Sequence, residues 1–379
     1  MNAARRAPDA TGAFEIALRP VAAIEAAAWD DLFARAGDAH PHFSRHVLAA
    51  HRAAGLAPAD LAAVTVWRSG RLEALLPYHV GRDLSGLGAR VARPYLSPFV
   101  TATDPLIAAD AEAADALVAG LVRASGGGPW RWPLIRLDSP ATLAMRAGME
   151  RAGWSLGTVA AFARPVLDRR ESHDALLAGH PNRSRFKDLR RRGKRLSESG
   201  ALRLDSATEG EALSAAVESF LALERAGWKG EAGTAMACRP AHAALARALF
   251  SDAPGPVSAR ADSLTLDGRP IAVSLALVGS GTATLLKTAY DESLRAQAPG
   301  LVLEAEIVRA CHETRFADRL DSATLAGSAL ESLYPERETL AEIVAVPPGA
   351  DLLSLDRRLS LARFEHRARE AAKTALRRR

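Results

Sequence analysis

The segment 284–311 has the residue types and spacing of an anion-binding strand–loop–helix unit. An apolar strand precedes the loop Arg295–Gly300, and a helical pattern starts at about Leu301. A helix N-terminus offers free backbone N–H groups and a partial positive charge, small residues before it let a phosphate approach, and an arginine adds a charge-assisted contact. The pattern predicts a pyrophosphate-binding loop. The alternative is an ordinary helix entry, with Pro299 and Gly300 as turn residues only.

Lys287 lies in the middle of the apolar strand that leads into this loop. An unpaired buried ammonium group is costly, so Lys287 either pairs with an acid or faces a cleft, and we expect the cleft. A carboxylate near a cleft can act as a general base. The candidates are Glu224, Asp291, Asp318 and Asp321, each of which is alternatively a surface charge or a helix cap.

Trp228 and Lys229 follow Glu224 closely, in the segment ERAGWKG. These two side chains are candidates for shaping the pocket of a second substrate. The alternative is that Trp228 belongs to the core and Lys229 is solvated.

The run 182–196 carries eight basic residues, which cannot all share one face of a helix. One interpretation is a solvated basic helix. The other is an anion site that includes Arg190 and Arg191 and would take a nucleotide-sugar diphosphate, a lipid diphosphate or a coenzyme phosphate. Arg191 and Arg195 also have the spacing of a cyclic-dinucleotide motif. Nucleic acid is not the expected partner, because Phe186 alone interrupts the run as an aromatic residue.

The elements that must position these residues follow from the hydrophobic pattern. In the first half we expect strands at 14–21, 134–137 and 156–167, helices at 22–36, 42–54, 109–123 and 141–152, and a hairpin at 63–80. In the second half we expect helices at 209–226, 241–250 and 301–314, a hairpin at 262–278, and strands at 282–290 and 316–322.

The two hairpins share a Gly-Arg turn, at Gly70-Arg71 and Gly268-Arg269, and similar elements surround both. This order predicts two copies of one α/β unit, each a mixed twisted sheet flanked by helices. We place the units at 13–165 and 166–350. The tail 351–379 is expected to be a basic helix with Leu355, Leu359, Leu361 and Phe364 on one face, either docked on the C-terminal half or lying on a membrane surface.

Composition limits the function classes. The chain has 379 residues, a net charge of +5 and two cysteines, which suits a reducing compartment and two soluble domains. The sequence has no closely spaced cysteine and histidine residues of the kind that bind zinc, so no metal is expected. No apolar run is long enough to cross a bilayer, and residues 1–12 have no apolar core for a signal peptide. The expected location is the cytoplasm.

The loop Arg295–Gly300 resembles the pyrophosphate signature of the GNAT acetyltransferase superfamily, with Ala298 where the general signature has its first glycine. Two segments, 223–235 and 287–308, resemble the CelD/BcsL branch, whose members are linked to bacterial cellulose and exopolysaccharide synthesis, and 320–337 resembles its closing strand and loop. The resemblance covers about 167–347 well and the first half only through topology. The FemABX aminoacyltransferases look like distant relatives with the same doubled fold.

The resemblance implies transfer of an acyl group from acyl-coenzyme A to an amine, without a covalent acyl-enzyme. The oxyanion would be stabilised by a backbone N–H of the strand 285–290. The implied roles are catalysis by Lys287, Asp321 and Glu224, coenzyme binding by Thr288, Tyr290, Arg295, Ala298, Gly300 and Leu301, and acceptor binding by Trp228, Lys229, Arg190 and Arg191.

The expected acceptor is an amino sugar or a similar precursor of a surface polysaccharide. A catalytically silent scaffold, or a nucleotide-responsive regulator, is the alternative, because no base is unambiguous and Pro299 removes one N–H from the loop.

Overall fold

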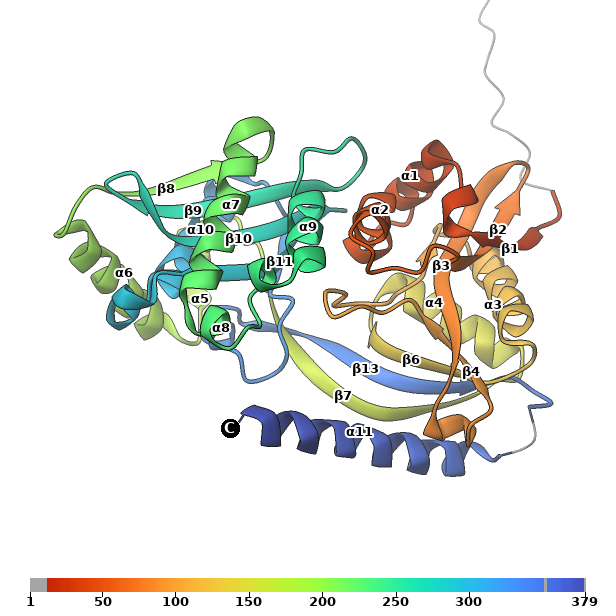
Figure 1. Cartoon of the computed structure of the whole chain (residues 1–379). Helices are drawn as coiled ribbons and strands as arrows, with labels where there is room; N and C mark the ends of the chain where they lie inside the picture. Colours follow the sequence, from red (N-terminus) through yellow and green to blue (C-terminus); the bar gives the residue numbers. More distant parts are fainter. Residues whose placement is uncertain (1–11, 351–352, 378–379) are drawn as a thin grey trace, which may run out of the picture.

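The computed structural model describes residues 12–350 and 353–377 (Figure 1). Almost all of the N-terminal segment considered above, and residues 351–352 and 378–379 of the tail, lie outside the described residues. In the N-terminal half the elements are β1 (Glu15–Pro20), α1 (Ala26–Arg35), α2 (Arg45–Ala53), β2 (Ala62–Arg68), β3 (Arg71–Arg82), β4 (Arg90–Pro94), β5 (Leu106–Ile107), α3 (Ala111–Ser125), β6 (Trp130–Arg136), α4 (Pro140–Arg151) and β7 (Ser155–Asp168).

The C-terminal half repeats much of this order. Its elements are α5 (His173–Gly179), α6 (Arg183–Ser197), β8 (Leu202–Ala207), α7 (Gly210–Ala226), α8 (Trp228–Glu231), α9 (Pro240–Leu249), β9 (Ser258–Leu266), β10 (Arg269–Gly279), β11 (Thr282–Tyr290), α10 (Pro299–Thr314), β12 (Arg319–Asp321), β13 (Glu336–Val346) and the tail helix α11 (Leu355–Arg377). Short 3₁₀ turns occur between them, among them η3 (Leu84–Gly86), η4 (Met236–Cys238), η5 (Glu292–Gln297) and η6 (Ala329–Ser332).

Both expected hairpins are confirmed. β2 pairs with β3 and β9 pairs with β10, each antiparallel. The turn residues Ser69-Gly70 and Asp267-Gly268 all have positive φ, between 50° and 79°. Two residues with positive φ form the turn whose twist suits a tight hairpin.

The strands of the described residues form one continuous sheet, in the order β1-β2-β3-β4-β6-β13-β7-β12-β11-β10-β9-β8. β13, which the hydrophobic pattern did not identify, lies between β6 and β7 and pairs antiparallel with both. On its other edge, the last residues of β7 pair with β12. β7 and β13 therefore form a long ribbon that joins the two halves (Figure 1), and the expected division at residue 165 falls within β7.

The C-terminal part of the sheet is covered on both faces. Val273, Leu275 and Leu277 of β10 belong to the apolar cluster that includes α7. The alternate residues Ala272 and Ala276 belong to the cluster that includes α10, α6 and α5. Because successive residues of a strand point to opposite faces, α7 covers one face and α10 with α5 and α6 covers the other.

The tail helix α11 docks against the β7–β13 ribbon (Figure 1). Leu359 and Ala362 are buried there, and Arg131 of β6 reaches Glu365 of the helix at 2.5 Å. Phe364, which was expected on the apolar face, is 60% exposed. The apolar face that α11 buries is therefore narrower than the sequence pattern indicated, because polar contacts such as that of Arg131 with Glu365 make up part of the docked surface.

The expected fold class is confirmed: a large mixed sheet is flanked by helices in a mixed α/β architecture. None of the described helices is both long and apolar enough to cross a membrane.

Candidate functional site

A cleft opens where β11 and β12 diverge. The two strands are parallel and pair only through Thr282–Thr284 and Arg319–Asp321. From Leu285 to Tyr290, β11 has a paired strand on its β10 side only, as far as the described residues show. Unpaired backbone groups on a strand edge can bind an extended ligand that carries amide groups.

A β-bulge lies at the start of this open edge. Leu285 pairs with Ala276 and Lys287 pairs with Leu275, so Leu286 is the extra residue on β11. A bulge leaves one residue out of the ladder and changes which face the following side chains meet. Leu285 accordingly faces α10, whereas Lys287 faces the α7 side of the sheet, as its partner Leu275 does.

Lys287 lies in the cleft, as expected from the sequence. Together with Leu286, it lines a cavity of about 150 Å³. Its ammonium nitrogen is 5.0 Å from the centre of the Phe99 ring. Burial, together with the positive charge of Lys229, lowers the pKa of Lys287, and the charge of Glu224 offsets part of this effect. The lysine is therefore closer to neutrality at pH 7 than a solvated lysine.

Glu224, at the end of α7, is buried and holds the adjacent segment together. One carboxylate oxygen is 2.8 Å from the Lys229 ammonium, and the other accepts the Met236 backbone N–H at 2.7 Å. Both oxygens therefore have donors already, and this arrangement makes Glu224 a positioning residue rather than a free base.

Trp228 and Lys229 lie beside the same cleft. Trp228 is 57% exposed, so its side chain is not part of the core. Its backbone N–H donates to Glu292 at 3.1 Å, which ties α8 to the 3₁₀ turn η5 before α10. The structure thus brings Glu224, Trp228, Lys229 and Lys287 into one region.

Asp321 lies at the end of β12 but is buried in an ionic network. One carboxylate oxygen is 3.4 Å from Arg164 and 3.5 Å from His40. Burial raises the pKa of Asp321, yet the positive charge of Arg164 and the nearby imidazole of His40 more than compensate and leave it well below the usual range. So low a pKa makes Asp321 a weak proton acceptor, and its contacts fit a positioning role.

The other two candidate carboxylates are occupied elsewhere. Asp291 accepts the Ser293 backbone N–H at 3.0 Å as the N-cap of η5. Asp318 forms an ion pair with Arg169 at 2.5 Å. The alternative interpretation, a helix cap or a surface charge, describes both.

The start of α10 has the features expected of an anion site. Its N-cap is Ala298, which provides no side-chain hydrogen bond, and no acidic residue lies in the first turn. Tyr290 packs against Gly300, where a Cβ would lie 3.1 Å from the ring. Pro299 has no N–H group, and the N–H groups of Leu301 and Val302 both donate to the Ala298 carbonyl at 3.0 Å. The Gly300 N–H is therefore the donor of this helix start that can serve a ligand.

The remaining coenzyme candidates lie around this helix start. The Thr288 hydroxyl contacts Ser274 at 3.2 Å on the α10 side of the sheet. Arg295 is exposed in η5. Ala298 has φ 51° and ψ 55°, the left-handed conformation that glycine adopts without strain. Ala298, which replaces the first glycine of the GNAT signature, thus keeps the backbone conformation that favours glycine.

Arg190 and Arg191 are not part of the cleft. Both lie on α6, which covers the face of the sheet opposite to α7 and Lys287. Arg191 pairs with Asp188 at 2.8 Å, and Arg190 borders a separate groove. The structure therefore does not bring these two arginines together with Trp228 and Lys229.

Sequence reasoning missed the contribution of the N-terminal half to the cleft. The segment after β4 provides Pro98, Phe99 and Thr101 to the cavity wall. His242 of α9 contacts the Phe99 ring edge-on at 4.8 Å. Burial and the nearby charges of Arg239 and Lys287 lower the pKa of His242, which favours its neutral form. No local pattern around Phe99 or His242 could have identified them, because the contact joins residues far apart in the sequence.

Comparisons with known proteins agree with this geometry. Residues 183–325 match the family model of the acetyltransferase (GNAT) domain. No curated protein sequence matches the chain significantly. Within the described residues, no group of three or more histidine, cysteine or acidic side chains is placed to hold a metal ion.

Solved structures with a similar fold include FemX, with a TM-score of 0.54 and 9% identity over 86% of this chain and 96% of FemX. A conserved protein of unknown function from Bacteroides thetaiotaomicron has a TM-score of 0.52 and 14% identity over 85% of this chain and 97% of its own. A tandem GNAT protein from the clavulanic acid biosynthesis pathway has a TM-score of 0.43 and 15% identity, over 88% and 99% of the two chains. At these identities, the first two likenesses show the fold alone.

Proposed function

We propose that the chain, whose residues 183–325 match the family model of the acetyltransferase (GNAT) domain, is an acyl-coenzyme A-dependent N-acyltransferase of the CelD/BcsL type. The observation that carries this proposal is the open edge of β11 with its bulge at Leu286, next to the uncapped start of α10. The pyrophosphate would bind the N–H group of Gly300, with Arg295 nearby. The amide-containing arm would pair with the edge that ends at Tyr290, leading the thioester toward Lys287.

The reaction follows from these positions. The acceptor amine attacks the thioester carbon, the C–S bond breaks, and the coenzyme leaves as a thiol once it gains a proton. A backbone N–H freed by the bulge, together with Lys287, stabilises the negative oxygen of the tetrahedral intermediate. Neutral His242 accepts the amine proton. Glu224 and Lys229 hold the wall of the acceptor pocket, and Asp321 fixes the end of β12 through Arg164.

The acceptor we propose is an amino sugar or a related precursor of a bacterial surface polysaccharide, and the proposed location is the cytoplasm. Support for this finer assignment comes from the resemblance of the segments 223–235 and 287–308. Exposed Trp228 beside the cleft fits a sugar ring, because carbohydrate faces pack on aromatic side chains.

A second candidate is a catalytically silent scaffold or nucleotide-responsive regulator. It is favoured by the small cavity of about 150 Å³ that Phe99 and Lys287 leave in the cleft. For comparison, ligand pockets usually enclose about 300–1,000 Å³. A cyclic dinucleotide that bridges Arg191 and Arg195 would be the ligand of such a regulator.

Calorimetric titration with acetyl-coenzyme A tests the binding part. Gly300→Glu places bulk against Tyr290 and a negative charge where the pyrophosphate would lie. Ala27→Glu is the matched control, because Ala27 is exposed and is also the second residue of a helix, α1. We expect Gly300→Glu to abolish binding and Ala27→Glu to retain it. Equal binding by both variants would refute the assignment of the α10 start.

Acyl transfer to a panel of amino sugars tests the catalytic part. Lys287→Met keeps the apolar stem but removes the ammonium group, so we expect kcat to fall at least tenfold while the affinity for acetyl-coenzyme A is unchanged. Wild-type binding without turnover on any amine would instead favour the silent scaffold.

A further inference from the structure

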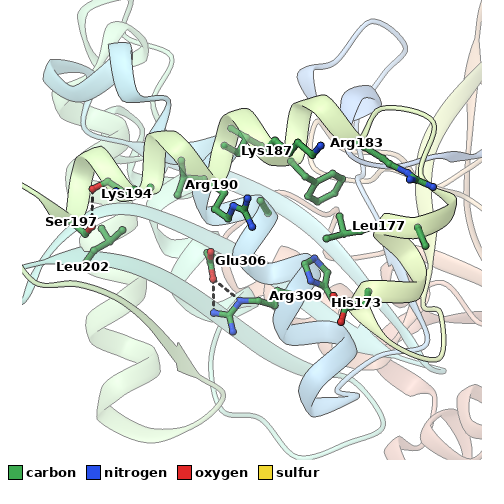
Figure 2. Close-up of a pocket in the computed structure, with 17 residues that line it drawn as sticks. His173, Leu177, Arg183, Lys187, Arg190, Lys194, Ser197, Leu202, Glu306 and Arg309 are labelled. Carbon is green, nitrogen blue, oxygen red and sulfur yellow. Dashed lines mark hydrogen bonds and ion pairs between the residues drawn. The ribbon is translucent and has the colours of Figure 1, made fainter.

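A second concave site lies on the far side of the C-terminal half. It is a groove of about 850 Å³ between α6 and α10, closed at one end by α5 (Figure 2). Its position is on the α10 face of the sheet, whereas Lys287 and Phe99 lie on the α7 face. The groove is thus separate from the proposed acyl-transfer cleft.

One wall of the groove is a row of cations. Arg183, Lys187, Arg190 and Lys194 recur at helical spacing along a single face of α6, and all four line the groove. The row is about 16 Å long, since an α-helix rises about 1.5 Å per residue. In Figure 2 the side chain of Arg190 points from α6 toward α10.

These four cations differ from the other basic residues of α6 in their pairing. Arg185, Arg191 and Arg192 share Asp188, at 2.8–3.2 Å. The four groove cations are exposed and have no ion pair with any residue in the described part of the chain. Across the groove, Arg309 is already neutralised by Glu306 at 2.5 Å and by Glu313 at 2.9 Å. The unbalanced charge in the groove is therefore positive.

The floor of the groove is apolar. It is formed by aliphatic side chains of four elements together with one buried aromatic ring: Leu177, Phe186, Leu189, Leu202, Val302 and Ala305. Phe186 is 8% exposed, so its ring is not available to stack on a base. Without stacking aromatics, a single-stranded nucleic acid is a poor match.

A polar group at the closed end lacks a partner. The Nε2 atom of His173 is buried without a hydrogen-bond partner among the described residues. His173 lines the groove on α5, next to Arg309 in Figure 2. Arg183, the first cation of the row, lies at the same end.

We propose that this groove binds an amphiphile with a phosphate-bearing headgroup and a hydrocarbon chain. The phosphate oxygens would contact the cation row of Arg183, Lys187, Arg190 and Lys194, and the chain would cover the apolar floor. Charge complementarity selects the anionic head, because four cations along one wall would otherwise remain uncompensated. The volume is in the range of sites that bind small molecules.

Titration of the full chain with dioctanoyl phosphatidic acid below its micelle concentration tests the proposal. The comparison ligands are dioctanoyl phosphatidylcholine, which carries no net charge, and inorganic pyrophosphate, which has no chain. We expect phosphatidic acid to bind at least tenfold more tightly than either. If phosphatidylcholine bound equally well, the cations would not select the ligand and the proposal would be refuted. If pyrophosphate bound equally well, the groove would be a site for free phosphate, the apolar floor would not contribute to binding, and the proposal would also be refuted.

Variants separate the two parts of the site. Arg190→Glu reverses a charge in the groove, and Arg195→Glu reverses one on the same helix outside it. Ala305→Phe fills the floor without changing the charge. We expect Arg190→Glu and Ala305→Phe to weaken phosphatidic acid binding about tenfold or more, and Arg195→Glu to leave it within twofold. Equal weakening by both charge reversals would mean non-specific attraction to a basic surface and would refute the proposal.

Discussion

The ion pair between Arg164 and Asp321 joins the two halves beneath the cleft, and Arg164→Met tests its contribution. The guanidinium group is 1% exposed, lies 3.4 Å from Asp321, and donates to the Thr101 carbonyl at 2.7 Å and the Thr324 carbonyl at 3.2 Å. At 3.4 Å and an effective dielectric constant of about 20, the Coulomb energy is about 5 kcal/mol. Removing one member of a buried pair costs about 3–5 kcal/mol.

We therefore expect Arg164→Met to lower the free energy of unfolding by about 3–5 kcal/mol, a large part of the roughly 5–15 kcal/mol that stabilises a typical domain. Urea denaturation of Arg164→Met, Asp321→Asn and the double variant measures the coupling. The double variant should recover about 1–3 kcal/mol relative to the sum of the two single changes. Arg151→Met is the control, because Arg151 pairs with Asp115 at the surface and such pairs contribute less than about 1 kcal/mol.

The pH dependence gives an independent check. Because the folded pKa of Asp321 lies below its unfolded value, its contribution to stability is present above the unfolded pKa and is lost as the pH falls through the folded pKa. In Arg164→Met, burial is left to raise this pKa, so the carboxyl takes up a proton in mild acid. The penalty of the substitution should then shrink between pH 7 and pH 4. A penalty that is constant with pH, with additive single changes, would refute the reasoning.

Two further predictions concern the start and the middle of α10. Ala298 has a left-handed backbone at φ 51°, which destabilises the folded state by about 1–2 kcal/mol for an L-residue other than glycine. Ala298→Gly removes this strain, but the greater chain entropy of unfolded glycine offsets about 0.5–1 kcal/mol of the gain. We expect urea unfolding to show a net increase of about 0.5–1 kcal/mol in the free energy of unfolding, and a decrease would contradict the prediction. Burial raises the pKa of Glu304 from 4.5 to about 7, although the hydrogen bond from Tyr334 opposes this shift. The free energy of unfolding should therefore fall by about 3 kcal/mol as the pH rises from about 4.5 to 7, at about 1.4 kcal/mol per pH unit. Glu304→Gln should flatten this decline in thermal melts, and an unchanged slope would count against it.

The parts of the site that a local pattern encodes could be predicted from the sequence. The loop before α10 and the strand with Lys287 at its centre follow from composition and hydrophobic spacing over a few residues. The bulge at Leu286 could not be predicted, because a register shift depends on the pairing of β11 with β10. The burial of Asp321 could not be predicted either, since its partners Arg164 and His40 come from β7 and from the N-terminal half.

The strand β13 shows the same limit for the fold. Its sequence, ERETLAEIVAV, carries three acidic residues and was not identified as a strand. Those charges are accommodated because its neighbours provide cations, as when Glu342 pairs with Arg131 of β6 at 2.6 Å. Cross-strand pairing thus overrides the weak intrinsic preference of glutamate for a strand.

The two halves share an element order but have different helix starts, which indicates that they have different roles in ligand binding. In the N-terminal half, α3 connects the diverging strands β4 and β6, as α10 connects β11 and β12 in the other half. Its start is capped by Asp110, which accepts the Glu112 backbone N–H at 2.8 Å, and Glu112 adds a second negative charge. Asp110, which is held by an ion pair with Arg68, already occupies a donor of this helix start, so that donor is not available to a pyrophosphate.

The space between the diverging strands of the N-terminal half is also differently used. β4 and β6 pair only through Ala92 and Trp130. Trp130 and Trp132 of β6 are fully buried and pack on each other with ring centres 5.4 Å apart. Bulky indole groups thus form core where the other half keeps an open edge. The N-terminal half contributes Phe99 and Thr101 to the cleft of the C-terminal half. The proposed function therefore predicts one coenzyme per chain, bound by the C-terminal half.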